Sequence, residues 1–175
     1  MTVLLAVKQD NQLILASDRQ VTKQWHLTGE ICKTFKKRGF IFAGSGGLRE
    51  IQLVMNKLTV PPMNEDHEMD GYVFEIVEAM RNIFIGYDKE CKRMNAEFLL
   101  IHKDGIYSID SNWCYLKSDN LLVKGSGEDV ALGAYKALEG FVDDTVERCK
   151  RTIEIVNENT LYCGHGVDVE VIELP

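Results

Sequence analysis

The chain has 175 residues, enough to bury a substantial core without disulfide or metal staples. Apolar residues make up 45% of it and charged residues 27%, proportions that are ordinary for a soluble globular protein. The formal net charge of −7 argues against a nucleic-acid binder, because nothing would neutralise the phosphates. The only basic cluster, KTFKKR (33–38), alternates with apolar residues as an exposed strand would, and we interpret it as a solvated face.

Cysteine usage and hydropathy indicate a reducing, aqueous compartment. The five cysteines form no CxxC pair and no metal-ligand spacing, which fits the cytosol better than a disulfide framework. The start, MTVLLAVKQD, lacks the basic region and cleavage site of a signal peptide. No apolar stretch approaches the ~20 residues that a membrane-spanning helix needs. We therefore expect one cytoplasmic domain over residues 1–175, without a membrane or nucleic-acid partner.

The first predicted element is a β-hairpin. Thr2–Val7 and Leu13–Ala16 are almost continuously apolar, and Asp10-Asn11 between them is a turn signal. Continuous apolarity, without alternation, indicates strands that are covered on both faces. If Asp10-Asn11 is a two-residue turn, the numbers of paired residues sum to 21. Asp18 then lies opposite Val3, beside the start of the chain.

The later elements follow from apolar spacing. Further strands are predicted at 39–45, 96–102, 105–110, 113–116, 121–124 and 167–172. Helices are predicted at 46–58, 73–84, 125–140 and 143–157. This order places strands, two helices, strands, two helices and a last strand along the chain. It predicts an α+β domain of two sheets between two helical layers, because alternating βαβ units would place a helix after each strand.

Thr2 is the sharpest chemical feature. A threonine hydroxyl becomes a useful nucleophile when a base takes its proton, and a free α-amino group with a pKa near ~7.7–8.0 can serve as that base. Such chemistry requires that Met1 be removed, and a small residue after Met favours removal. Many cytosolic proteins carry a small second residue without any catalytic reason, so Thr2 alone is weak support.

Asp18 and Lys33 form the second predicted feature. A carboxylate at the end of an apolar strand is costly without a partner, and Lys33 is a natural one. A positive charge near Thr2 would stabilise the alkoxide and lower the pKa of the α-amine through like-charge repulsion. The alternative, at about even odds, is that both residues are only turn and surface charges.

Glycine-rich segments supply candidate backbone donors. Gly44-Ser45-Gly46-Gly47 lies between a strand and a helix start, where free N–H groups could form an oxyanion hole. A packing turn is the alternative for each glycine. Ser126 is by default an N-cap of the helix at 125–140, and it joins a proton relay only if the fold brings it to Thr2. No GxGxxG nucleotide motif is present.

Together these segments resemble the proteasome β-subunit family and its bacterial HslV-type peptidases. The resemblance rests on four segments and one residue. The residue is Lys33, at the spacing of the family lysine. The segments are TVLLAVKQDNQLILASDRQVT (2–22), AGSGG (43–47), KGSGEDVALGAYKAL (124–138) and LYCGHGVDVEVIEL (161–174). It implies a four-layer αββα Ntn-hydrolase sandwich. It also implies a threonine peptidase in which Thr2 attacks, Asp18 and Lys33 tune the proton balance, Gly46 holds the oxyanion and Ser126 completes the relay.

The resemblance further implies how a substrate and partners would bind. Thr22 and Gly46 would pair with the backbone of an extended polypeptide, and Ile31 and Gly44 would shape a roomy apolar pocket. The subunits would form a homo-oligomeric ring of six or seven members, alone or as two stacked rings. The matching segments carry no ATP site, so unfolding would fall to a separate AAA+ ATPase. No cofactor is required, although a cation near Thr160, where proteasome subunits carry aspartate, is conceivable as in the bacterial type. The segment 59–95 resembles neither branch closely.

Two other functions stay open at this stage. A catalytically silent ring or scaffold subunit would retain the fold and its assembly surfaces, and would keep Met1. An Ntn amidohydrolase would use the same nucleophile on small amides and would leave unfolded proteins intact. A metal enzyme is the least favoured class, because the four histidines, His26, His67, His102 and His165, show no ligand spacing.

Overall fold

The computed structural model describes residues 2–9, 11–23, 26–63, 68–87 and 93–175. Its strands are β1 (Leu4–Gln9), β2 (Gln12–Asp18), β3 (Gln20–Lys23), β4 (His26–Glu30), β5 (Thr34–Lys37), β6 (Phe40–Gly46), β7 (Ala96–His102), β8 (Gly105–Ile109), β9 (Tyr115–Ser118), β10 (Leu121–Lys124) and β11 (Val167–Glu173). Its helices are α1 (Leu48–Lys57), α2 (Met69–Tyr87), α3 (Glu128–Leu138) and α4 (Thr145–Asn159). The predictions made for Met1, Asp10, His67 and Cys91 concern positions outside these residues.

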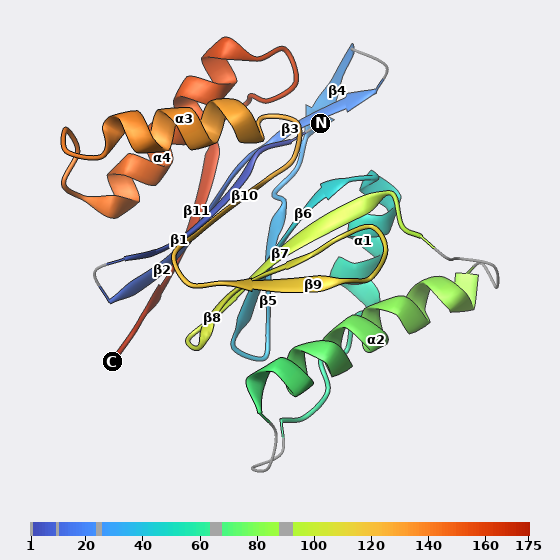
Figure 1. Cartoon of the computed structure of the whole chain (residues 1–175). Coiled ribbons are helices and arrows are strands. Elements are labelled where there is room, and N and C mark those ends of the chain that lie inside the picture. Colours follow the sequence, from blue (N-terminus) through green and yellow to red (C-terminus); the bar gives the residue numbers. More distant parts are fainter. Residues whose placement is uncertain (1, 10, 24–25, 64–67, 88–92) are drawn as a thin grey trace.

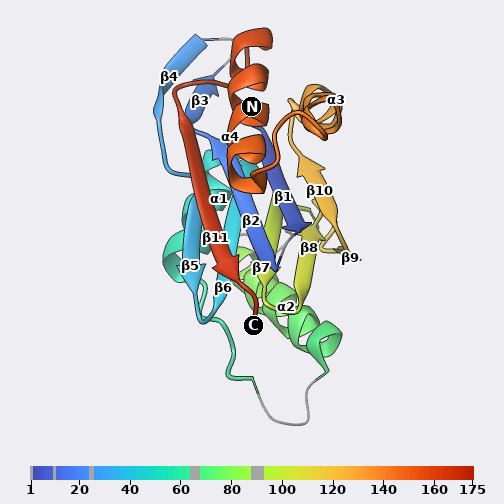
Figure 2. The same cartoon turned by 90° about the vertical axis from the view of Figure 1, so that its left-hand side faces the viewer.

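The strands form two main antiparallel sheets. One has the order β10-β1-β2-β11, and the other has the order β5-β6-β7-β8-β9. A separate ribbon of β3 and β4 projects beyond them (Figure 1). Helices α3 and α4 cover the first sheet, and α1 and α2 cover the second, so that the helices lie on the outer faces (Figures 1 and 2).

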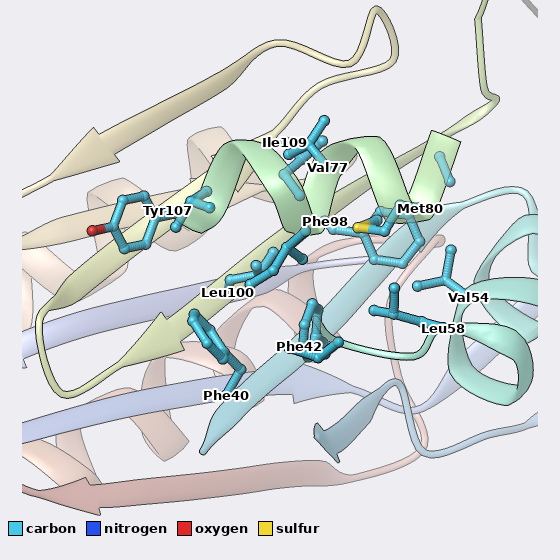
Figure 3. Packing of buried hydrophobic residues seen from close by; sticks show 14 of the residues in the cluster. Phe40, Phe42, Val54, Leu58, Val77, Met80, Phe98, Leu100, Tyr107 and Ile109 are labelled. Carbon is cyan, nitrogen blue, oxygen red and sulfur yellow. The ribbon is translucent and has the colours of Figure 1, made fainter. Parts of the chain in front are cut away.

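Three apolar clusters hold this arrangement together. Residues of β6, β7 and β8 pack against α1 and α2, as Figure 3 shows for Phe42, Phe98 and Met80. Residues of β1 and β2 pack against α3 and α4, and a third cluster lies between the two sheets. Along β1, Leu5 points to the helices, whereas Leu4 and Ala6 point to the facing sheet. Burial on both faces explains the continuous apolarity of this strand.

The opening hairpin has the predicted register. Leu4 pairs with Ser17 and Gln9 pairs with Gln12, so that the paired numbers sum to 21. Asn11 takes the left-handed conformation, with φ of 59°, which asparagine tolerates better than most residues and which suits a tight hairpin turn. Asp18 consequently closes β2 beside the chain start, where its amide donates to the Val3 carbonyl at 3.3 Å. The predicted placement of Asp18 is confirmed.

Three expectations need correction. The predicted N-cap Ser126 does not cap α3, since Gly127 occupies that position without a side-chain bond. The strand predicted at 113–116 begins at Tyr115, because Trp113 has a φ of 68° in a turn. The basic cluster does form the edge strand β5, but Lys33 just before it is 3% exposed and therefore is not part of a solvated face.

Candidate active site

Thr2 lies immediately before β1 and is held by the turn between β10 and α3. Its backbone N lies 3.1 Å from Ser126 Oγ and donates to it. Its carbonyl accepts from the Gly127 amide at 3.3 Å and from Ser126 Oγ at 3.4 Å. A Cβ at Gly125 would lie 2.3 Å from this same carbonyl, so only glycine lets the turn approach so closely. Two segments 124 residues apart thus fix the main chain of Thr2 next to Ser126.

Asp18 lies beneath Thr2 and is fully buried. Its Oδ1 accepts from the Val3 amide at 2.9 Å and from Lys33 Nζ at 2.7 Å. Its Oδ2 accepts from the amides of Gln20 at 3.1 Å and Gly164 at 3.3 Å. Four donors therefore satisfy the carboxylate, which removes most of the cost of burying it and fixes its direction.

Lys33 is the cation of this buried pair. Burial is the largest influence on it and lowers the pKa of its ammonium group below 10.5, while the charge of Asp18 and the hydrogen bond to it act in the opposite direction. The carboxylate of Asp18 therefore favours the charged form of Lys33 against the effect of burial. The alternative that Asp18 and Lys33 are unrelated surface charges is therefore wrong.

Gly46 presents a backbone N–H toward the same region. The Gly44 amide donates to the Lys33 carbonyl at 3.2 Å, and the Gly47 amide donates to the Asn95 carbonyl at 2.6 Å. Because N–H directions alternate along a strand, the amide of Gly46 points to the same edge as that of Gly44. Gly46 also has a φ of 99° and lines the pocket that contains Thr2.

That pocket has a volume of about 220 Å³, and its lining is mixed. Thr2, Gln20, Lys33 and Thr22 contribute polar groups, while the apolar walls are Val21, Ile31, Leu48 and Ile51. Of the predicted substrate-binding residues, Thr22, Ile31 and Gly46 line it. Gly44 lies behind the wall, since a Cβ there would come within 2.8 Å of the Ile51 side chain.

Several residues of the site had no distinct sequence signal. Gln20, Gly164 and Cys163 come from polar or mixed segments. Gln20 bonds Asp18 locally through its backbone amide, whereas Gly164 and Cys163 reach Asp18 only through the fold. Ile51 falls within the helix predicted at 46–58, and it is both a core residue and part of the pocket wall. Burial raises the pKa of the Cys163 thiol to about 11, so this cysteine is not a thiolate nucleophile at neutral pH.

Comparisons with known proteins bear on this geometry. No family model matches the chain. It is 25% identical over 177 residues to the ATP-dependent protease subunit HslV of Campylobacter concisus, an alignment that covers 98% of each protein. The HslV subunit of Petrotoga mobilis is 24% identical, with 98% of this chain and 97% of that one covered. The resemblance to HslV-type peptidases is confirmed.

Solved structures agree in fold. The structure of Thiobacillus denitrificans BPH in complex with epoxomicin has a TM-score of 0.83 at 18% identity, and the match covers 99% of this chain and 100% of that one. Eukaryotic HslV from Trypanosoma brucei has a TM-score of 0.71 at 20% identity, with 98% and 99% covered. These matches show a shared fold over 98–99% of this chain. The described helices contain none that is long and apolar enough to cross a membrane.

Proposed function

We propose that this chain is the threonine peptidase subunit of a ring-shaped, ATP-dependent protease, and that its αββα Ntn-hydrolase fold serves to assemble one site around Thr2. The observation that carries this proposal is the convergence of Ser126, the buried pair of Asp18 and Lys33, and the Gly46 amide on the second residue of the chain. Removal of Met1 turns the Thr2 amide nitrogen into a free α-amine at this place.

The reaction begins with a proton transfer. The α-amine takes the proton of the Thr2 hydroxyl, and the oxygen attacks the scissile carbonyl. The negative charge that develops on the carbonyl oxygen accepts a hydrogen bond from the Gly46 amide. Collapse of the tetrahedral intermediate breaks the C–N bond, and the leaving amine takes the proton from the ammonium group. Water, deprotonated by the same amine, then hydrolyses the ester on Thr2 and restores the hydroxyl.

The buried pair sets the proton balance of this cycle. The positive charge of Lys33 stabilises the alkoxide and lowers the pKa of the nearby amine, which keeps the amine available as a base. Asp18 keeps Lys33 charged and anchors the Val3 amide, the next link of the chain after the nucleophile. Ser126, which bonds the nitrogen of Thr2, relays protons between that nitrogen and the site.

The pH dependence of hydrolysis follows from these roles. We expect a bell-shaped profile of kcat/KM, whose acid limb reflects protonation of the α-amine near or below ~7.7–8.0. The alkaline limb reflects loss of the Lys33 proton and lies below pH 10.5, because burial lowers the pKa of Lys33. In Lys33→Arg any remaining activity should lack this alkaline limb, since arginine keeps its charge. An unchanged alkaline limb in Lys33→Arg would refute this role of Lys33.

Gly46→Ala tests the oxyanion site. A Cβ at Gly46 would lie 2.3 Å from the Asn95 carbonyl oxygen, and the φ of 99° disfavours alanine, so the amide must move. We expect hydrolysis to fall by about 100-fold or more, the scale on which misplaced oxyanion donors act. Gly71→Ala, at an α2 glycine with open space around it, is the matched control and should retain full activity. Equal activities of the two variants would contradict the assignment of Gly46.

The pocket indicates which peptide bonds are cut. Its apolar walls favour an apolar side chain next to the scissile carbonyl, and Thr22 and Gly46 line the pocket where the backbone of an extended polypeptide would lie. The relatives are named subunits of an ATP-dependent protease. By that likeness we propose a homo-oligomeric ring in the cytoplasm that receives unfolded chains from a separate ATPase. The number of subunits in the ring and a cation near Thr160 stay predictions.

An epoxyketone probe tests the function directly. The protein is expressed without a tag at its N-terminus, treated with epoxomicin and digested for mass spectrometry. We expect a one-to-one adduct on the peptide that begins at Thr2, together with hydrolysis of an unfolded protein in the presence of the ATPase. Absence of labelling in Met-free protein would favour the silent scaffold subunit. Labelling with turnover of small amides only would favour the amidohydrolase.

A further inference from the structure

The loop between α4 and β11 packs directly behind Asp18. Both backbone groups of Gly164 are bound to the end of β2, since its amide donates to Asp18 Oδ2 at 3.3 Å and its carbonyl accepts from the Arg19 amide at 3.1 Å. Cys163, which is 2% exposed, fills the space next to Val3 and Gly127. The carboxylate that holds Lys33 is thus held in turn by this loop.

Gln20 is the side chain that connects this loop to the site. It is 8% exposed and lines the pocket that contains Thr2. Its Nε2 donates to the Leu161 carbonyl at 3.2 Å, and its backbone amide donates to Asp18 Oδ2 at 3.1 Å. A buried carboxamide is costly unless it is hydrogen-bonded, so this contact resists opening of the loop.

Gly164 lacks a side chain, and this leaves room for the Gln20 carboxamide against the loop. A Cβ at this position would lie 2.4 Å from Gln20 Oε1. Its φ lies outside the left-handed range, so the backbone itself would accept alanine. An alanine at this position would therefore displace the Gln20 carboxamide from the space that it fills.

We propose that Gln20 is a positioning residue, whose carboxamide fastens the segment 161–164 so that the Gly164 amide stays on Asp18 and keeps that carboxylate directed at Lys33. The effect on hydrolysis rests on the proposed function, whereas the effect on the loop does not. Neither Gln20 nor Gly164 takes part in the bonds that form or break.

The charged groups around Asp18 determine how a loosened loop would show itself. Lys33 faces Asp18 from the segment before β5. Arg19, the next residue, pairs with Asp168, with 3.6 Å between Arg19 Nε and Asp168 Oδ2. The Cys163 thiol faces Asp18 from the loop. A less firmly held Asp18 supports the charge of Lys33 less well. The alkaline limb of the pH profile should then move to lower pH.

A double-mutant cycle with a hydrogen-exchange readout tests this inference in the assembled protein. The variants are Gln20→Ala, Gly164→Ala and the double variant, with Gln20→Met as an isosteric second choice in case Gln20→Ala fails to fold. Gln12→Ala is the matched control, because the Gln12 side chain donates to the exposed Glu173 side chain at the other end of β2. Amide exchange of the peptide containing residues 161–166 is followed by mass spectrometry, alongside kcat, KM and the pH profile.

We expect faster exchange of residues 161–166 in Gln20→Ala or Gln20→Met, and a fall in kcat of about tenfold with KM little changed. The alkaline limb should move down in pH. Gly164→Ala alone should have a similar effect, but little further effect in the Gln20→Ala background, because the clashing atom is gone. Unchanged exchange of the loop or strictly additive effects would overturn the inference. Faster exchange without any hydrolysis by the wild type would support the positioning contact and refute the proposed function instead.

Discussion

Thr2→Ala is expected to abolish peptide hydrolysis, with a loss on the order of 10⁴–10⁶ in kcat, the range seen when a catalytic nucleophile is removed. The α-amine, the Asp18–Lys33 pair and the Gly46 amide all remain in this variant, so the loss isolates the hydroxyl. The thermal unfolding midpoint should change little, because the backbone bonds of residue 2 to Ser126 and Gly127 remain.

Two comparisons sharpen this result. Thr2→Ser keeps a hydroxyl at the same atom and should retain measurable hydrolysis and epoxomicin labelling. Thr59→Ala removes an exposed threonine just after α1 and should behave as the wild type. Hydrolysis by Thr2→Ala within tenfold of the wild-type rate would place the nucleophile elsewhere, and the proposed mechanism would then be wrong.

Asp18→Asn is expected to have the largest effect on stability. It removes the charge that compensates Lys33, which is 3% exposed and has its Nζ 2.7 Å from Asp18 Oδ1. Breaking one side of a buried ion pair costs about 3–5 kcal/mol in the free energy of unfolding. Urea denaturation measures this loss. Hydrolysis should fall as well, since the ammonium group of Lys33 is no longer held in place by a carboxylate.

The Lys33 that remains in Asp18→Asn leads to two further predictions about stability. Lys33→Met added to Asp18→Asn should recover part of the lost stability, because it removes the uncompensated charge. The stability of Asp18→Asn should rise with pH, because folded Lys33 loses its proton before unfolded Lys33 does, near ~10.4. Glu139→Gln, in an exposed pair with Lys136, should cost less than about 1 kcal/mol. A stability of Asp18→Asn equal to that of the wild type would contradict the account of the pair.

Local sequence patterns were sufficient to predict much of the fold and the Asp18–Lys33 pair of the site. Continuous apolar runs revealed strands buried on both faces, and the turn at residues 10 and 11 set the register that brings Asp18 to the chain start. Once that register is known, a partner for the buried carboxylate is required by electrostatics alone. Lys33 was the predicted partner, and the distance of 2.7 Å between its Nζ and Asp18 Oδ1 confirms the pair.

The parts that could not be predicted depend on long-range contacts. The ribbon of β3 and β4 has mixed polar sequences, and no regular spacing of apolar residues predicts its pairing. Ser126 had the features of a helix cap, yet it bonds Thr2, 124 residues away. Gln20 and Gly164 are 144 positions apart by number and meet only because β11 pairs with β2. Such contacts arise from the topology of the whole chain, and the sequence of a single segment is not sufficient to predict them.

The central claim is that a free α-amine at residue 2 acts on its own side-chain hydroxyl. The most direct measurement is the mass of the N-terminal peptide in protein purified from its native host. The account predicts that the mature chain starts at Thr2, without Met1 and without any group on the amine. A population that retains Met1 throughout, while still hydrolysing unfolded protein, would contradict it.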